Sequence, residues 1–279
     1  MMHQLIIGMP NSGKSTFIAA LRHLLLANEV TTELKLTGLA ENEAHLNLLE
    51  RDWLACQMVE RTKPATEGWV QFHVRDQESG IESTLSIPDL RGEAFEQPAC
   101  IGKCQKELHD SLIETDGILL FTNADREDDA LLISDFSDIL GEDETADQQP
   151  LHGFKPENMP EEVKIVEFLQ FANRRPRYPR KRKVAVLISA WDIVENQHVL
   201  LPDKWLETHR PMLAQFLETN YDLWETRVYG ISAQGGKLPE MQVTLEKIKK
   251  PSERIRVVGN CAKIHDLSAP LRWLMLEHR

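Results

Sequence analysis

One short segment near the start of the sequence constrains this chain more than any other feature. Residues Gly8 to Thr16 read G-M-P-N-S-G-K-S-T and follow the apolar run Leu5-Ile6-Ile7. This is a Gly-x4-Gly-Lys-Ser phosphate-binding loop, placed between an expected strand and an expected helix as its mechanism requires. The glycines allow a tight turn that aims backbone N–H groups at phosphate, and the helix adds its positive end. The alternative is a glycine-rich turn without a ligand.

The polar residues of this loop have expected roles that follow from their chemistry. The Lys14 ammonium is expected to reach the β- and γ-phosphates of a nucleotide, and the Ser15 hydroxyl to ligate Mg²⁺. The other residues expected to contact the nucleotide here are Asn11, Ser12, Gly13 and Thr16.

Composition excludes several other classes of protein. The 279 residues are 42% apolar and 27% charged, which is typical of a globular chain, and the net charge of −12 argues against general binding to nucleic acid or anionic membranes. No segment reaches the roughly 18 apolar residues of a membrane span. The expected first strand leaves no room for a signal peptide. The four cysteines lack metal-type spacing, so we expect a cytoplasmic protein with free thiols.

Hydrophobic periodicity predicts strands that alternate with helices. This pattern is typical of an α/β fold with three layers: a mainly parallel sheet with helices on both faces. We expect one domain over residues 1–279, with insertions at about 29–61 and 123–182 and an extension at about 236–279. Strands are expected at 2–7, 69–74, 83–87, 117–121, 184–189 and 226–231, and helices at 14–28, 42–59, 94–114, 161–171, 203–219 and 271–278.

The second insertion is strongly charged. Ten acidic residues and one arginine lie between Asp125 and Asp147, and we expect a surface insertion, helical only at about 130–140. Seven of the ten residues from Arg174 to Lys183 are basic. This run is interpreted as a solvated loop, as a docking surface for an acidic partner or lipid, or as an arginine finger.

A nucleotide bound through Mg²⁺ needs further residues at the ends of neighbouring strands. Asp89 in Asp89-Leu90-Arg91-Gly92 follows a strand and is expected to serve the metal, while the Gly92 N–H senses the γ-phosphate. The Asp-x-x-Gly of residues 138–141 follows no strand. Thr66 is the expected threonine ligand of Mg²⁺ and the γ-phosphate, with Thr62 as the alternative.

Two later strand ends suggest recognition of guanine. Asp192 ends Ser189-Ala190-Trp191-Asp192, and a carboxylate can accept from both N1–H and the 2-amino group of guanine. One strand later, Ser232 and Ala233 form a turn whose backbone N–H can bond guanine O6. The segment from Thr122 to Asp125 is a rival for the role of Asp192.

Taken in this order, the motifs resemble those of the translation-factor-like and Ras-like (TRAFAC) GTPases. The resemblance covers about residues 3–235, and more narrowly the chain looks like the bacterial double-GTPase families of predicted conflict or phage-defence loci. It implies a Ras-like fold, GTP and GDP as ligands, Mg²⁺ as cofactor, and hydrolysis of GTP. It also implies a protein partner, either a second GTPase or a GTPase-associated effector, and a role in antiviral defence.

The sequence departs from this class at several positions. Ser189 and Ala190 replace the usual Asn/Thr and the lysine that covers the base, and Gln234 replaces a second lysine. Trp191 is expected either over the base or as a tryptophan of the core or the surface. Glu93 stands where a water-orienting glutamine is usual, so it either slows hydrolysis by repelling phosphate or lies in the first turn of a helix.

Three functions are compatible with these residues. The first is a molecular switch that binds GTP with Mg²⁺ and hydrolyses it slowly, with Lys14, Thr66, Gly92 and Glu93 around the reacting phosphate. The second is a pseudo-GTPase scaffold that binds nucleotide without turnover. The third is a P-loop kinase or ATPase acting on a small molecule, with the basic run as its lid.

Overall fold

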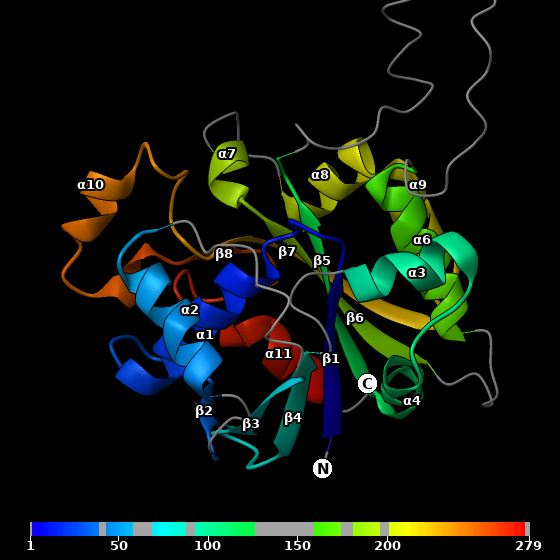
Figure 1. The fold of residues 1–279 in the computed structure, drawn as a ribbon, viewed down its shortest axis with the longest axis horizontal. Coiled ribbons are helices and arrows are strands. Elements are labelled where there is room, and N and C mark those ends of the chain that lie inside the picture. Colours follow the sequence, from blue (N-terminus) through cyan, green and yellow to red (C-terminus); the bar gives the residue numbers. More distant parts are fainter. Residues whose placement is uncertain are drawn as a thin grey trace, which may run out of the picture.

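The computed structural model describes residues 2–38, 43–57, 69–87, 93–125, 159–173, 181–195 and 201–276. These residues form an α/β fold around an eight-stranded sheet of order β2-β3-β4-β1-β5-β6-β7-β8 (Figure 1). The strands are β1 (Met2–Gly8), β2 (Leu34–Leu36), β3 (Val70–Asp76), β4 (Glu82–Ile87), β5 (Gly117–Asn123), β6 (Arg182–Ser189), β7 (Trp224–Ser232) and β8 (Arg256–Val258).

The sheet is parallel in its centre and antiparallel at both edges. Strands β4, β1, β5, β6 and β7 run parallel, whereas β2, β3 and β8 pair antiparallel with their neighbours. The prediction of a mainly parallel sheet is therefore confirmed. The central strands are continuous apolar runs because helices cover both of their faces.

Helices cover the sheet on both faces, which confirms the predicted three layers. Helices α1, α2 and α11 pack in one hydrophobic cluster, and α3, α4, α6, α8 and α9 in the other (Figure 1). The described helices are α1 (Lys14–Ala27), α2 (Glu43–Leu54), α3 (Glu93–Ile101), α4 (Lys106–Glu114), α6 (Glu161–Asn173), α7 (Trp191–Glu195), α8 (Pro202–His209), α9 (Pro211–Thr219), α10 (Gln242–Glu246) and α11 (Ser268–Met275), with the 3-10 helix η2 (Pro251–Arg254).

Strand β5 illustrates how the sequence builds the two faces. Successive side chains of a strand point to opposite sides. Accordingly, Ile118 and Leu120 lie in the cluster with α3 and α6, while Leu119 and Phe121 lie in the cluster with α1. On the α1 side, Phe17 meets Phe121 edge-on, with ring centroids 5.1 Å apart.

Two of the predicted helices are each divided in two. The stretch predicted at 94–114 ends as α3 before Gly102, whose φ of +64° is the left-handed conformation that commonly ends a helix, and resumes as α4. The stretch predicted at 203–219 breaks at Arg210, since the following Pro211 has no N–H and disfavours helical backbone before it.

The end of the basic run corrects its interpretation as a loop. Strand β6 begins at Arg182, and both Arg182 and Lys183 are buried. Arg182 donates to the Leu112 and Ala172 carbonyls, at 3.0 Å each, and its guanidinium lies 4.9 Å from the Trp224 ring centroid. These two cations are therefore part of the core. Residues 174–180 of the run and the acidic residues 126–150 lie outside the described residues.

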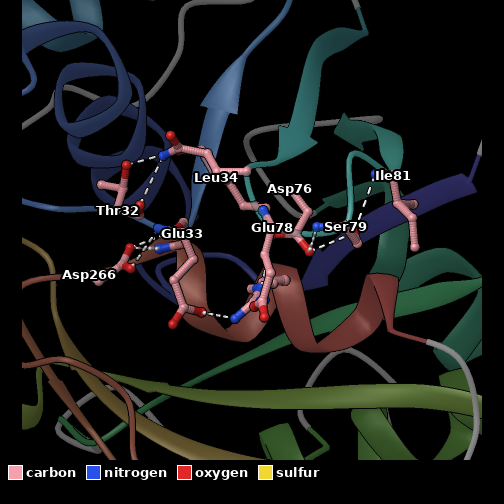
Figure 2. Close-up of polar contacts among 11 residues, drawn as sticks. Thr32, Glu33, Leu34, Asp76, Glu78, Ser79, Ile81 and Asp266 are labelled. Atoms are coloured by element: carbon pink, nitrogen blue, oxygen red, sulfur yellow. Dashed lines mark hydrogen bonds and ion pairs between the residues drawn. The ribbon is translucent and has the colours of Figure 1, made fainter.

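A polar cluster around the buried Asp76 fixes α11 to the end of the sheet opposite the strand ends that carry the motifs. Arg272 of α11 donates to Asp76 Oδ1 at 3.0 Å and pairs with Glu33 at 3.1 Å. Figure 2 shows Glu33 near Asp266, whose Oδ2 accepts the Glu33 N–H at 3.1 Å. Burial would raise the pKa of Asp76, but hydrogen bonds from Ser79 and the Arg272 charge hold it below its ordinary value.

Nowhere in the described part of the chain does a helix have the length and apolar character needed to cross a bilayer.

Candidate functional site

The carboxyl ends of the parallel strands meet at one edge of the sheet. Gly8 at the end of β1 is in register with Phe121 of β5, Asn123 with Ser189 of β6, and Ile188 with Gly230 of β7. Each of these strands therefore delivers its following loop to the same edge. Ligands bind at this edge in open α/β sheets.

The phosphate loop joins β1 to α1, as predicted, and its two glycines are required by contact. A Cβ on Gly8 would lie 2.6 Å from Ser12 Oγ and 2.8 Å from the Phe121 Cβ. Gly13 has φ +88°, and a Cβ there would lie 2.8 Å from the Ser189 Cβ. The loop can therefore fold this tightly only because both positions lack a side chain.

The ammonium of Lys14 is held inside the loop. Its Nζ donates to the Gly8 carbonyl at 2.8 Å, to the Met9 carbonyl at 2.7 Å and to Ser12 Oγ at 3.1 Å. The side chain is buried, so its charge lies at a fixed position at the start of α1. Ser15 and Thr16 follow in the first turn of α1 and are half-buried.

A cavity of about 320 Å³ lies between this loop and the ends of β5, β6 and β7. A volume of that size is within the range of small-ligand sites. Of the predicted nucleotide-binding residues it brings together Asn11, Gly13, Thr16, Asp192, Ser232 and Ala233. Its other lining residues include Gln57, Asn123, Asp125, Ser189, Ala190, Ile193, Gln234, Lys237 and Leu238.

Asp192 and Ser232 form a hydrogen-bonded pair on the wall of this cavity. The Ser232 hydroxyl donates to Asp192 Oδ1 at 2.5 Å and accepts the Gly235 N–H at 3.1 Å. The serine thereby orients the carboxylate and closes the turn after β7. The two motifs that the sequence placed one strand apart are thus in direct contact.

Trp191 packs in the core. It is 2% exposed, and its ring lies against Gly230, where a Cβ would be 2.2 Å from the nearest ring atom. Its ring also meets Trp205 edge-on, with centroids 6.4 Å apart. Of the two interpretations, the core position is therefore confirmed, and Trp191 does not line the cavity.

Asn123 links the rival segment to the phosphate loop, a contact that the sequence reasoning missed. Its Nδ2 donates to the Asn11 carbonyl at 3.0 Å, and its Oδ1 accepts the Asp125 N–H at 3.0 Å. Asn11 has φ +61°, the left-handed region that asparagine adopts more often than most residues, and this bond supports that conformation. The only sequence signal was a polar residue at the end of a buried strand beside β1.

The end of β5 is itself supported by a buried arginine. Arg210 is 1% exposed; its Nε donates to Thr122 Oγ1 at 3.2 Å, and its Nη2 to Glu161 at 2.6 Å. A buried charge is tolerated when it is paired and hydrogen-bonded, and Glu161 and Thr122 provide these contacts for Arg210. It holds the strand end from which Asn123 reaches the phosphate loop.

Several predicted residues cannot be placed. Thr66, the alternative Thr62, Asp89 and Gly92 lie outside the described residues. Glu93 is the first residue of α3, and its side chain is likewise outside them. Within the described part of the chain there is no cluster of three or more His, Cys, Asp or Glu side chains suited to a metal.

The sequence matches one protein-family model over almost its whole length. The model of the family described as Double-GTPase 1 matches residues 5–274. The chain belongs to the Double-GTPase 1 family. No match was found among curated proteins.

Several solved structures resemble this Double-GTPase 1 member at low sequence identity. The S. cerevisiae Ski7 GTPase-like domain bound to GTP is 15% identical, with a TM-score of 0.44 over 84% of this chain and 43% of that chain. The bacterial selenocysteine-specific elongation factor EF-Sec is 12% identical, with a TM-score of 0.38 over 90% and 28%. The cytosolic domain of the T. maritima FeoB iron transporter in a GDP form is 12% identical, with a TM-score of 0.31 over 89% and 65%. The chain spans less than half the length of the first two.

Proposed function

We propose that this protein is a guanine-nucleotide switch. It binds GTP with Mg²⁺, hydrolyses it slowly to GDP, and presents the two states differently to a partner protein. The observation that carries the proposal is that the phosphate loop and the Asp192–Ser232 pair line one cavity. Membership of the Double-GTPase 1 family supports it.

The phosphate end of the cavity fits a triphosphate. Glycines at 8 and 13 keep side chains out of the loop, and the buried Lys14 ammonium supplies a positive charge at the start of α1. The bond from Lys14 to Ser12 Oγ is longer than those to the Gly8 and Met9 carbonyls, and we propose that phosphate oxygens replace it. Asn11, Ser12, Gly13 and Thr16 then complete the phosphate site with their backbone and hydroxyl groups.

The same end suits Mg²⁺, which prefers few protein ligands together with phosphate oxygens and water. The proposed protein ligands are the hydroxyls of Ser15 and Thr66 and the carboxylate of Asp89. Bound Mg²⁺ would neutralise charge on the β- and γ-phosphates. Lys14 stabilises the same charge from the loop, the Gly92 N–H senses the γ-phosphate, and Glu93 makes hydrolysis slow.

The other end of the cavity suits guanine. Ser232 binds one carboxylate oxygen of Asp192. The lone pairs of the two carboxylate oxygens can accept hydrogen bonds from the N1–H and the 2-amino group of guanine. The Ala233 N–H is proposed to donate to O6. Adenine lacks both the N1–H and the 2-amino group, so the pair selects guanine.

Two alternatives differ in what supports them. A scaffold that binds nucleotide without turnover is favoured by Glu93 in the place of the water-orienting glutamine, and by Ser189 and Ala190 in the base motif. The small-molecule kinase is disfavoured, because Arg182 and Lys183 of its expected lid are buried in the core. A second GTPase or GTPase-associated effector as partner, and a role in antiviral defence, remain proposals that rest on the family.

Multiple-turnover phosphate release tests the proposal. The full chain is incubated with GTP or ATP and Mg²⁺, with Lys14→Ala as the matched inactive variant. We expect slow release from GTP, little from ATP, and none from the variant. Equal phosphate release from ATP and GTP would indicate a nucleotidase that does not select guanine. Tight GTP binding with no release over many hours, with or without a partner GTPase, would leave the scaffold as the function.

A further inference from the structure

Helix α2 contacts the loop after β7, although the two lie far apart in the sequence. The Trp53 indole N–H donates to the Ala233 carbonyl at 2.9 Å, across 180 residues of chain. The amide of Gln234 in turn donates to the Trp53 carbonyl at 3.4 Å. Trp53 is fully buried, so its N–H and the Ala233 carbonyl satisfy each other without water.

Arg254 contacts both the end of α2 and the loop after β7. Its Nη1 donates to the Trp53 carbonyl at 3.4 Å and to the Leu54 carbonyl at 3.3 Å, which are the last carbonyls of α2. Its guanidinium lies 5.5 Å from the Trp53 ring centroid. The Arg254 backbone also packs against Gly235, where a Cβ would lie 2.4 Å from the Arg254 carbonyl oxygen.

The same helix is tied to the phosphate-loop helix. The His23 ring of α1 lies 5.2 Å from the Trp53 ring, and Arg22 of α1 pairs with Glu50 of α2. Beyond its last turn, α2 brings Gln57 to the cavity wall. Trp53 therefore lies between the helix that begins at the phosphate site and the loop proposed to read the base.

We propose that Trp53 is a positioning residue for guanine recognition, holding the loop of residues 232–236 through the Ala233 carbonyl. This inference rests on the proposed function. A hydrogen bond at Ala233 fixes the orientation of the neighbouring peptide groups, including the N–H proposed to meet guanine O6. Without the indole N–H, the buried carbonyl has no partner and the peptide group turns to find one.

The substitution Trp53→Phe removes the N–H and keeps an aromatic ring. Trp273→Phe is the matched control, because Trp273 is 4% exposed and lies in the same hydrophobic cluster, where its ring meets the charges of Lys183 and Arg227. The full chains are compared by displacement of a fluorescent GDP with GDP and with 6-thio-GDP. Sulfur is a poor hydrogen-bond acceptor, so the ratio of the two affinities reports the contact at O6.

We expect the preference of the wild type for GDP over 6-thio-GDP to fall about fivefold in Trp53→Phe and to stay unchanged in Trp273→Phe. Arg254→Lys keeps the charge but loses the bonds that Nη1 donates to the Trp53 and Leu54 carbonyls. It is therefore expected to shift the ratio in the same direction if Trp53→Phe does not fold. An unchanged ratio, or an equal loss for both nucleotides together with a lower Tm, would overturn the inference. Failure of the wild type to bind either nucleotide would instead overturn the proposed function.

Discussion

Replacement of Asp192 by asparagine tests the proposed base contact with almost no change in shape. The Asp192 Oδ1 atom accepts the Ser232 hydroxyl at 2.5 Å, and asparagine retains one oxygen for this bond. Its NH2 group then takes the place of the second carboxylate oxygen. That donor would face the N1–H and 2-amino donors of guanine, so two charge-assisted hydrogen bonds are lost.

The expected loss is large compared with other single substitutions. A hydrogen bond to a charged group contributes about 1.5–3 kcal/mol, so the pair contributes about 3–6 kcal/mol. At about 1.4 kcal/mol for each factor of ten, the Kd for GDP rises by at least about a hundredfold. Xanthine carries a carbonyl in place of the 2-amino group. This oxygen cannot pair with the wild-type carboxylate but can accept from the new NH2, so the affinity for XDP should rise in Asp192→Asn.

The assay is equilibrium binding of GDP, XDP and ADP to the wild type, to Asp192→Asn and to Asp125→Asn. Asp125 is the matched control, because it is a second carboxylate on the wall of the same cavity. We expect Asp125→Asn to keep the preference for GDP. If Asp192→Asn kept that preference and Asp125→Asn lost it, the segment from Thr122 to Asp125 would be the base motif and our assignment of the strands would be wrong.

Three further predictions concern the supports of the site and the fold. Asn123→Ala removes the bond to the Asn11 carbonyl, so the Kd for GDP should rise about fivefold in a binding titration with no change in base preference; an unchanged Kd would show that the loop holds itself. Gly230→Ala places a Cβ 2.2 Å from the Trp191 ring, so urea denaturation should show a loss of about 1–3 kcal/mol, and full stability would contradict this packing. Asp76 has a lowered pKa in the folded state, so its stabilising effect is present above about pH 4, the ordinary value, and is lost as the pH falls through the folded pKa. Asp76→Asn should therefore unfold at lower temperature at neutral pH and lose less Tm on acidification than the wild type, whereas parallel Tm curves would refute the role of its charge.

The local part of the site could be predicted because it is encoded in neighbouring residues. The phosphate loop has fixed spacing between a strand and a helix, and β1 and α1 have the expected positions. The contact between Asp192 and Ser232 could also be anticipated, since the ends of adjacent parallel strands meet at one edge. The roles of Thr66, Asp89, Gly92 and Glu93 stay predictions.

Short elements and helix breaks were harder to predict. Strands β2 and β8 have three residues each, too few to show an alternating pattern. They form the two edges of the sheet because β3 and β7 pair with them. Arg182 and Lys183 belong by composition to a basic loop. Their burial is possible only because carbonyl groups and aromatic rings from distant segments meet their charges.

The spacing of residues that are close together in the chain encodes the phosphate loop, the apolar core strands and the order in which these strands follow one another along the chain. Tertiary structure alone decided that Asn123 holds the phosphate loop, that Trp191 packs in the core, and that Trp53 meets Ala233. These contacts depend on which strand lies beside which and on where α2 packs. A hydrogen bond between groups 180 residues apart leaves no local pattern, since either partner could bond elsewhere until the sheet and its helices fix the distance between them.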